Sequence, residues 1–279
     1  MSYTAPMPEG AEVTLSRDFL RHEILNKKIV GINFYASGRY REGRKPPKGM
    51  DLFNYYLKRN ELSVQAVNVK GKLMWWRLAN DLCLTATFGM SGQWRTKPCK
   101  HAAYSFHFED ATGIFFEDIR HFGTLAFLDN EGMSSKLRSL GPDMLNAPPT
   151  LEDFTKRLKK RSNKTLPEVL MNQKVISGVG NYIKAESLYR AKLSPHRTIE
   201  SLNDNDFKDL YKAIRVVMEK AYAQGGATIR SFSNPDGKEG YATKSFLVYR
   251  HEKDPLGHAV INEDTKDKRT TWWVPSIQK

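Results

Sequence analysis

The stretch NQKVISGVGNYIKAESLYRAKLSP, residues 172–195, decides the fold of the second half of the chain. Its SGVG segment, residues 177–180, places two glycines at a turn, and a helix is predicted to follow over residues 181–191. A shorter helix precedes the turn, because Thr165 and Glu168 have the spacing of a capping box. Two helices joined by a glycine-containing turn predict a compact helical unit.

Further helices flank this unit in the sequence. The pair Pro148-Pro149 marks a break, and Thr150 can cap the helix that follows it. Downstream, apolar residues recur at helical spacing over residues 207–221, and the glycine pair at residues 225–226 ends that helix. We therefore predict a helical domain over residues 150–226.

The first half of the chain has the pattern of a β-sheet domain, since short β-branched or aromatic-rich segments alternate with glycine or polar residues. The predicted strands are residues 62–69, 72–78, 82–88, 103–108 and 114–116. Thr14 or Ser16 is predicted to cap one helix ahead of them. Many short strands favour a β-sandwich, so residues 8–147 are predicted to form an N-terminal sandwich domain with a flanking helix.

The C-terminal part is predicted to be a loop followed by a β-hairpin. Residues 227–245 are rich in Gly, Ser and Asn, and long loops of this kind are often functional. The strand-like segments FLVYR, HAVI and RTTWWV then return over residues 246–279, with a DPLG turn at residues 254–257 in the hairpin. The whole chain is thus predicted to have an α+β fold.

The charge of the chain favours a polyanionic partner. Its 44 Lys and Arg residues outnumber its 31 Asp and Glu residues, which gives a net charge of +13. Charge alone leaves a nucleic-acid binder and an unrelated basic enzyme about equally open. Basic residues cluster in two stretches, which are Arg41, Arg44, Lys45 and Lys48, and Lys156, Arg157, Lys159, Lys160, Arg161 and Lys164.

Cysteine content and hydropathy bound the location of the protein. Cys83 and Cys99 are its two cysteines, so neither a disulfide framework nor a zinc site with histidines is predicted. No apolar run approaches the roughly 20 residues of a membrane span, and the N-terminus lacks the features of a secretory signal. We expect a monomer without a membrane partner in a reducing intracellular compartment, which is the nucleus, the cytoplasm or a viral replication compartment.

Four motifs in a fixed order carry a resemblance to a known family. They are MPEGAEV at residues 7–13, TFGMSG at 87–92 with DIRHFG at 118–123, LGPDML at 140–145 leading into the stretch 172–195, and KRTTWWVPSIQK at 268–279. In this order they resemble the formamidopyrimidine-DNA glycosylase / endonuclease VIII family over nearly the whole chain. The resemblance implies a bifunctional DNA glycosylase and strand-nicking lyase of base-excision repair, whose helix-two-turn-helix domain binds damaged, double-stranded DNA.

The resemblance assigns the chemistry to Pro8 and Glu9. An N-terminal proline is a secondary amine that can attack C1′ of the sugar and form an iminium (Schiff base), after which β- and δ-elimination nick the strand. Glu9 matches the family's catalytic acid. In the full sequence the Pro8 nitrogen is an amide, so we expect translation from Met7 or removal of residues 1–7 in the active enzyme. Outside this context, PEG is more often a simple turn.

Two further basic residues are implied in the catalytic site. Lys72, with Lys70 as the alternative, matches a strand lysine that binds the phosphate beside the lesion. Arg269, preferred over Arg250, matches the arginine of a C-terminal finger that grips the same phosphate. Many family members bind zinc there, but residues 246–279 contain no cysteine. We therefore expect a zincless finger, as in some eukaryotic and viral relatives, and no metal or other cofactor.

The resemblance also implies residues that replace an extruded base. Met90, Arg120 and Phe122 match a trio that fills the gap left in the duplex, whereas core packing is the alternative role of the two apolar side chains. His101 matches a DNA-contacting histidine.

Phosphate contacts are expected at the start of the helix after SGVG. Asn181 and exposed backbone N–H groups there are expected to bind a phosphate, and Gly178 and Gly180 would let it approach closely. Simple helix capping is the alternative role of Asn181. Lys164, from the second basic cluster, is also expected to contact DNA.

The substrate and a competing function stay open. PEG after Met7 resembles the endonuclease VIII side of the family, which prefers oxidised pyrimidines. GGATIRSF at residues 225–232 and the loop 227–245 resemble the formamidopyrimidine side, which takes oxidised purines, and suggest a lesion-capture loop. The alternative is a non-catalytic DNA- or RNA-binding protein that uses the helix-two-turn-helix domain.

Overall fold

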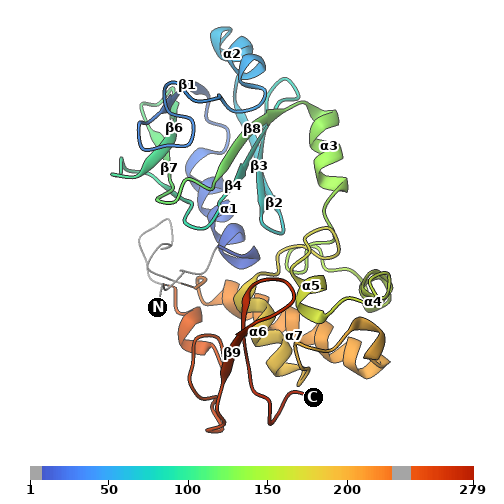
Figure 1. The fold of residues 1–279 in the computed structure, drawn as a ribbon. Helices are drawn as coiled ribbons and strands as arrows, with labels where there is room; N and C mark the ends of the chain where they lie inside the picture. The colour runs from blue at the N-terminus through green and yellow to red at the C-terminus, as the bar shows by residue number, and fades with distance from the viewer. Residues whose placement is uncertain (1–7, 228–239) are drawn as a thin grey trace.

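The chain folds into a β-rich half and a helical half, which a computed structural model describes over residues 8–227 and 240–279 (Figure 1). The helices are α1 Gly10–Ile24, α2 Met50–Lys58, α3 Asn130–Arg138, α4 Leu151–Lys159, α5 Leu166–Leu170, α6 Asn181–Arg190, η1 Ile199–Ser201, α7 Asp204–Ala223 and η2 Ala242–Ser245. The strands are β1 Ile29–Phe34, β2 Val64–Lys70, β3 Leu73–Leu78, β4 Cys83–Thr87, β5 Gln93–Arg95, β6 Ala102–Phe108, β7 Gly113–Glu117, β8 Thr124–Leu128, β9 Ile261–Asp264 and β10 Thr270–Trp273. The predicted α+β fold is confirmed.

The β-rich half is a sandwich of two four-stranded antiparallel sheets. One sheet has the order β1-β6-β7-β5 and the other the order β2-β3-β4-β8. Aromatic side chains fill the space between them, with the Trp76 ring centroid 5.2 Å from that of Trp94 and 5.1 Å from that of Phe106. The sandwich predicted from the many short strands is thus present, with one apolar face on each sheet.

The five predicted strands are present with ends shifted by at most about two residues, but several short elements were not predicted. These are β1, β5, β8, α2 and α3. Long-range packing stabilises them: Phe53 of α2 stacks on Phe127 of β8 with ring centroids 4.4 Å apart, and its ring also meets Phe106. Such contacts leave little local signal in the sequence.

The first helix begins earlier than predicted. Thr14 and Ser16 do not cap it, because α1 starts at Gly10 with Glu9 at the N-cap position. The Glu9 N–H donates to the carboxylate of Glu12, 2.9 Å away, while the Thr14 hydroxyl donates to a carbonyl within the helix. This early start draws both glutamates into the interior.

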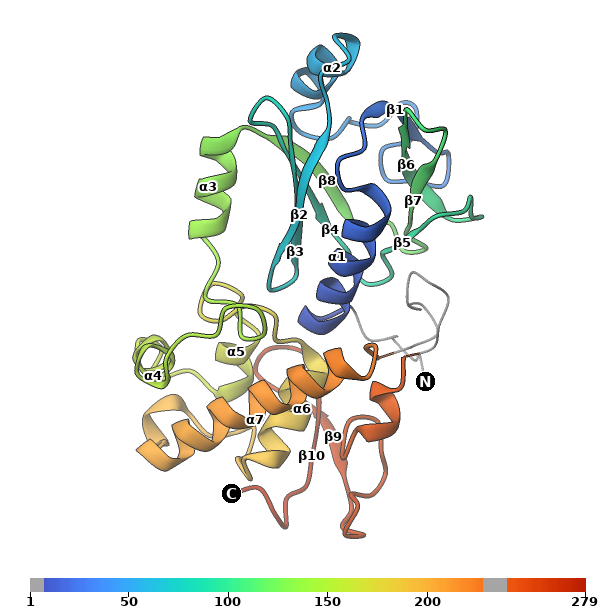
Figure 2. The same ribbon diagram turned by 180° about the vertical axis from the view of Figure 1, so that it is seen from behind.

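The helical half and the C-terminal hairpin share one apolar core. Thr150 caps α4, and the capping box of Thr165 and Glu168 opens α5, both as predicted. Buried Val248 and Val274 join the core formed by α4 to α7. Strand β10 packs against α6, and Figure 2 shows the hairpin behind α6 and α7. The domain limits at residues 147, 150 and 226 stay predictions.

The C-terminal segment differs from its prediction in two ways. Residues 246–250 form no strand, and the hairpin of β9 and β10 turns at residues 265–269 rather than around DPLG. DPLG makes its own tight turn, in which the Asp254 N–H donates to the His258 carbonyl. Most of the predicted lesion-capture loop, residues 228–239, lies outside the described residues; its flanks pair at Ala227 and Tyr241.

Among the residues that the structure describes, no helix combines the length and the apolar character needed to cross a bilayer.

Candidate active site

The Glu9 carboxylate is seated at the N-terminus of α6. Its Oε1 accepts the Tyr182 N–H at 3.0 Å and its Oε2 accepts the Ile183 N–H at 3.3 Å. The side chain is buried, with 1% of its surface exposed. Free N–H groups at a helix start favour an anion, so these two donors serve Glu9. The prediction that they are exposed for a phosphate is wrong.

Four glycines permit the close approach of the segments around Glu9. A Cβ at Gly180 would overlap the Glu9 carboxylate, and one at Gly71 would meet residue Ser177. Gly178, with φ of +99°, lies against Gly10, whose N–H donates to the Gly178 carbonyl at 2.9 Å. Gly178 and Gly180 therefore allow a close approach, but the group that approaches them is the protein's own N-terminal segment.

A second buried carboxylate, Glu12, lies behind the first and was missed in the sequence. It accepts the Glu9 N–H, the Tyr182 hydroxyl at 3.1 Å and the Ala227 N–H at 2.8 Å. Burial raises its pKa above the usual 4.5. An acidic residue among the apolar positions of a helix start was the signal that could have indicated it.

Pro8 and Lys72 line one small cavity beside Glu9. The cavity has a volume of about 210 Å³, and its lining is Pro8, Lys72, Leu73, Thr87, Phe88, Gly89, Lys136, Leu140 and Gln173. Lys72 was predicted to lie on a strand, but it lies in the turn between β2 and β3. Lys70 points elsewhere, since its Nζ donates to the Leu137 carbonyl at 2.9 Å. Geometry therefore selects Lys72.

The electrostatics of the site depend on burial and on opposite charges. Burial raises the pKa of Glu9 from 4.5 to about 7, although the Lys72 charge opposes the shift. Burial likewise lowers the pKa of Lys72, against the attraction of Glu9, and the charge of Arg269 lowers it further. A carboxyl group with a pKa near neutrality can both give and accept a proton. The arrangement is suited to proton transfer next to Pro8.

We expect the Glu9 carboxyl to make stability depend on pH. Between pH 4.5 and about 7 the folded chain keeps a proton on Glu9 that the unfolded chain has released. The stability from this group is therefore complete below pH 4.5 and is lost as the pH rises to about 7. Urea unfolding from pH 4 to 8 should show that Glu9→Gln gains stability relative to wild type across this window.

The matched control is Glu168→Gln, because the Thr165 N–H lowers the pKa of Glu168. The stability that Glu168 contributes is present above pH 4.5 and is lost in acid. The difference in unfolding free energy between Glu168→Gln and wild type should therefore change below pH 4.5. A Glu9→Gln curve that runs parallel to the wild-type curve from pH 4.5 to 7 would contradict the burial of an ionisable group at this position.

The hairpin brings Arg269 to the same region. Arg269 is exposed at the end of the turn that precedes β10. The Asn181 side-chain amide donates to the Thr270 carbonyl at 2.9 Å, so Asn181 holds the hairpin and does not cap α6, in which it is the first residue. Arg250 is also exposed, and its guanidinium lies 5.5 Å from the centre of the Tyr249 ring. The charge that acts on Lys72 is that of Arg269.

Met90, Arg120 and Phe122 lie on two adjoining loops of the sandwich. Phe122 is 54% exposed, and the Arg120 guanidinium lies 5.8 Å from its ring centre. Both loops are held by buried Asp118, whose carboxylate accepts the Ser91 hydroxyl and the Gly123 N–H, each at 2.7 Å.

Solvent exposure excludes core packing as the role of Phe122, and Met90 is partly exposed. His101 adjoins the same loops, since its carbonyl accepts the Asp118 N–H at 3.0 Å. The structure therefore gathers four predicted DNA contacts on one edge of the sandwich.

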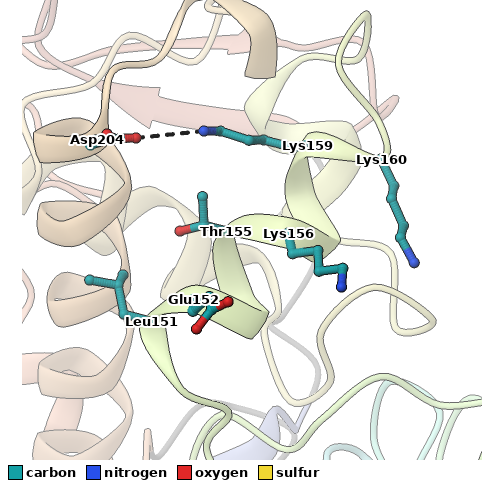
Figure 3. Close-up of a pocket in the computed structure, with 7 residues that line it drawn as sticks. All are labelled: Leu151, Glu152, Thr155, Lys156, Lys159, Lys160 and Asp204. Atoms are coloured by element: carbon teal, nitrogen blue, oxygen red, sulfur yellow. Dashed lines mark ion pairs between the residues drawn. The ribbon is translucent and has the colours of Figure 1, made fainter.

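Three of the six basic residues in the cluster at residues 156–164 form ion pairs with acidic side chains. Lys164 contacts Glu168 at 3.2 Å, and Lys159 contacts Asp204 at 3.5 Å. Figure 3 shows the Lys159–Asp204 pair at a cavity of about 830 Å³, whose lining also includes Lys160. The lining of this cavity includes none of the predicted catalytic residues. The Lys164 side chain contacts Glu168 of α5, and its backbone carbonyl accepts the Ile199 N–H of η1 at 2.9 Å.

A zinc site does not fit the C-terminal hairpin. Residues 246–279 contain no cysteine, and within the described ranges no group of three or more His, Cys, Asp or Glu side chains is placed to hold a metal ion. The hairpin is instead closed by the Thr265 and Thr271 hydroxyls, 2.7 Å apart, and by the Trp273 indole N–H on Glu263 at 2.6 Å.

Three family models match consecutive parts of the chain. They describe the formamidopyrimidine-DNA glycosylase N-terminal domain at residues 7–125, its H2TH domain at 140–233 and its C-terminal domain at 239–279. Similar proteins include the formamidopyrimidine-DNA glycosylase of Listeria monocytogenes, 32% identical over 98% of this chain and 100% of that protein. The protein of that name from Thermus thermophilus is 31% identical over 89% of each chain.

Solved structures extend the likeness to three dimensions. The crystal structure of the MutM (Fpg) protein of Thermus thermophilus matches with a TM-score of 0.83 and 28% identity, covering 97% of this chain and 98% of that one. Lactococcus lactis Fpg, solved with abasic-site DNA, matches with a TM-score of 0.83 over 97% and 99% of the two chains. At 22% identity, the second likeness concerns the fold alone.

Proposed function

The chain belongs to the formamidopyrimidine-DNA glycosylase family, and from this premise we propose that it is a bifunctional DNA glycosylase and lyase of base-excision repair that acts through Pro8. The observation that carries the proposal is that Pro8 and Lys72 line one cavity, while the charges of Glu9, the residue after Pro8, and of Arg269 act on Lys72. Damaged duplex DNA is the proposed partner.

In the proposed reaction the unprotonated Pro8 nitrogen attacks C1′ of the damaged nucleotide. The new N–C1′ bond replaces the bond to the base, which leaves with the proton that the Pro8 nitrogen releases, and the sugar ring opens to leave an iminium. Glu9, with its pKa of about 7, supplies a proton to the opening ring. The iminium acidifies the hydrogen on C2′, so loss of that proton expels the 3′ phosphate, and a second elimination expels the 5′ phosphate.

The other site residues are proposed to hold the DNA. Lys72 and Arg269 offer positive charge to the phosphate beside the lesion. Met90 and Phe122 replace the stacking that the extruded base loses, and Arg120 pairs with the orphaned base. His101, Asn181 and Lys164 are proposed as further DNA contacts, with Lys164 supported only by its exposure and charge.

The C-terminal hairpin is proposed to work as a zincless finger. Its hydroxyl and indole contacts close the turn without cysteine ligands. The proposed substrates are ring-opened purines, hydantoins and oxidised pyrimidines.

Borohydride reduction of the iminium tests the proposal. We expect the protein that begins at Pro8 to form a covalent adduct with duplex DNA carrying an abasic site, because reduction makes the N–C1′ bond permanent. Gel analysis of the adduct is the measurement, and an undamaged duplex is the control. Tight binding without any adduct would instead support the non-catalytic nucleic-acid binder.

A further inference from the structure

A fully buried ion pair joins α6 to the turn of the C-terminal hairpin. Lys184 Nζ lies 2.8 Å from Asp267 Oδ2, and the two side chains are 0% and 4% exposed. The Lys27–Asp110 pair in the sandwich has the same 2.8 Å separation, but its side chains are 27% and 43% exposed. Burying two charges costs free energy unless the geometry of the pair is well fixed. We therefore expect Lys184 to have a role besides packing.

Asp267 fixes the hairpin turn from within. Its Oδ1 accepts the Thr265 hydroxyl at 2.6 Å, while Oδ2 is the atom that meets Lys184. The Thr265 N–H donates to the Arg269 carbonyl at 3.2 Å, and Lys268, at φ of +59°, donates its N–H to the Thr265 carbonyl. The backbone from Thr265 to Arg269 is therefore held in one tight conformation.

Helix α6 holds this turn on both sides of Arg269. Lys184 binds Asp267, two residues before Arg269, and Asn181, one helical turn earlier, binds the carbonyl of Thr270, the residue after it. Burial lowers the pKa of Lys184, and the positive charge of Arg269 acts in the same direction. Arg269 thus lies near Lys184 and near Lys72, although its own side chain is exposed.

We propose that Lys184 is a positioning residue for Arg269: its buried pair with Asp267 fixes the hairpin turn on α6 and so holds the Arg269 guanidinium beside Lys72. The inference rests on the proposed function, in which Arg269 binds a phosphate next to the lesion. Lys184 itself is buried and touches no DNA. The pair and the Thr265–Thr271 contact supply the rigidity that a hairpin without cysteine ligands needs.

A double-mutant cycle between Lys184→Met and Arg269→Ala tests the proposal. Binding of the Pro8-initiated protein to a duplex with a stable abasic-site analogue is measured at several salt concentrations. Each single variant should weaken binding by about tenfold, the value of one charge-assisted contact, and should lower the salt slope by about one phosphate. The double variant should bind about as weakly as either single one, because both remove the same contact.

Lys27→Met is the matched control, since it breaks a Lys–Asp pair of equal length outside the site and should bind as wild type does. Additive losses in the double variant, or unchanged binding by Lys184→Met, would overturn the inference. If Lys184→Met fails to fold, Lys184→Met/Asp267→Leu removes both charges and keeps the volume apolar. Weak binding by that folded variant supports positioning, whereas wild-type binding overturns it.

If the proposed function were wrong, the experiments would give a different set of results from those that overturn the role of Lys184. Wild-type protein would then give no borohydride adduct and no preference for the abasic-site analogue, and the inference would fall with it. Wild-type protein that forms the adduct while Lys184→Met keeps its affinity and salt slope overturns the role of Lys184 alone.

Discussion

A chain that keeps residues 1–7 is expected to form borohydride adducts more than about 10³-fold more slowly than the chain that begins at Pro8, as when an enzyme loses its nucleophile. The reason is electronic, because the lone pair of an amide nitrogen is delocalised into the carbonyl and cannot attack C1′. Pro8 is buried at the cavity that holds Lys72. Single-turnover trapping with both forms, each verified by mass spectrometry, makes the comparison.

Lys72 provides the sharpest control for this experiment, because burial lowers its pKa and makes its amine the competing nucleophile. Residual trapping by the extended chain that disappears in the Lys72→Met variant would place the reactive amine on Lys72. Equal trapping by both forms in a Lys72→Met background would contradict a role for the Pro8 nitrogen.

Gly180→Ala is expected to cost about 3 kcal/mol of unfolding free energy, the upper range for overpacking a close-fitted interior, and to abolish adduct formation. The added Cβ would overlap the Glu9 carboxylate against α6. Backbone strain makes no contribution, since Gly180 has φ of −129°, which any residue can adopt. Urea unfolding and trapping on the same samples measure the two effects.

Gly31→Ala is the matched control for Gly180→Ala. A Cβ at Gly31 would find its nearest neighbour, a His107 atom, at 4.0 Å, so this variant should keep nearly all of its stability and activity. Wild-type stability in Gly180→Ala would show that the Glu9 carboxylate does not occupy the N-terminus of α6.

Local signals account for the parts of the fold that the sequence could predict. The caps at Thr150 and Thr165 and the turn before Asn181 each depend on residues a few positions apart, and all three are confirmed. The helix α2 depends on the distant Phe127 and the short strand β5 on its pairing with β7, and neither left a comparable pattern in the sequence.

In the candidate site, too, local motifs could be predicted from the sequence and long-range contacts could not. Motifs indicated Pro8, Glu9 and Lys72 individually, and the structure brings them together. The bond from Tyr182 to Glu9 spans 173 positions, and the Lys184–Asp267 pair spans 83, so neither follows from local spacing. An isolated lysine in a helix gives no sign in the sequence of whether its partner is water or a buried aspartate.

The seating of Glu9 and Glu12 limits how the protein can be recombined with its relatives. The first turn of α1 is continuous with the sandwich in the chain, yet its carboxylates complete the start of α6 and hold Tyr182 and Ala227. A chimaera joined near Pro149 would separate these carboxylates from the N–H groups they satisfy. An exchange of segments with a relative would therefore have to transfer the first turn of α1 together with the helical half, although the two are not continuous in the sequence.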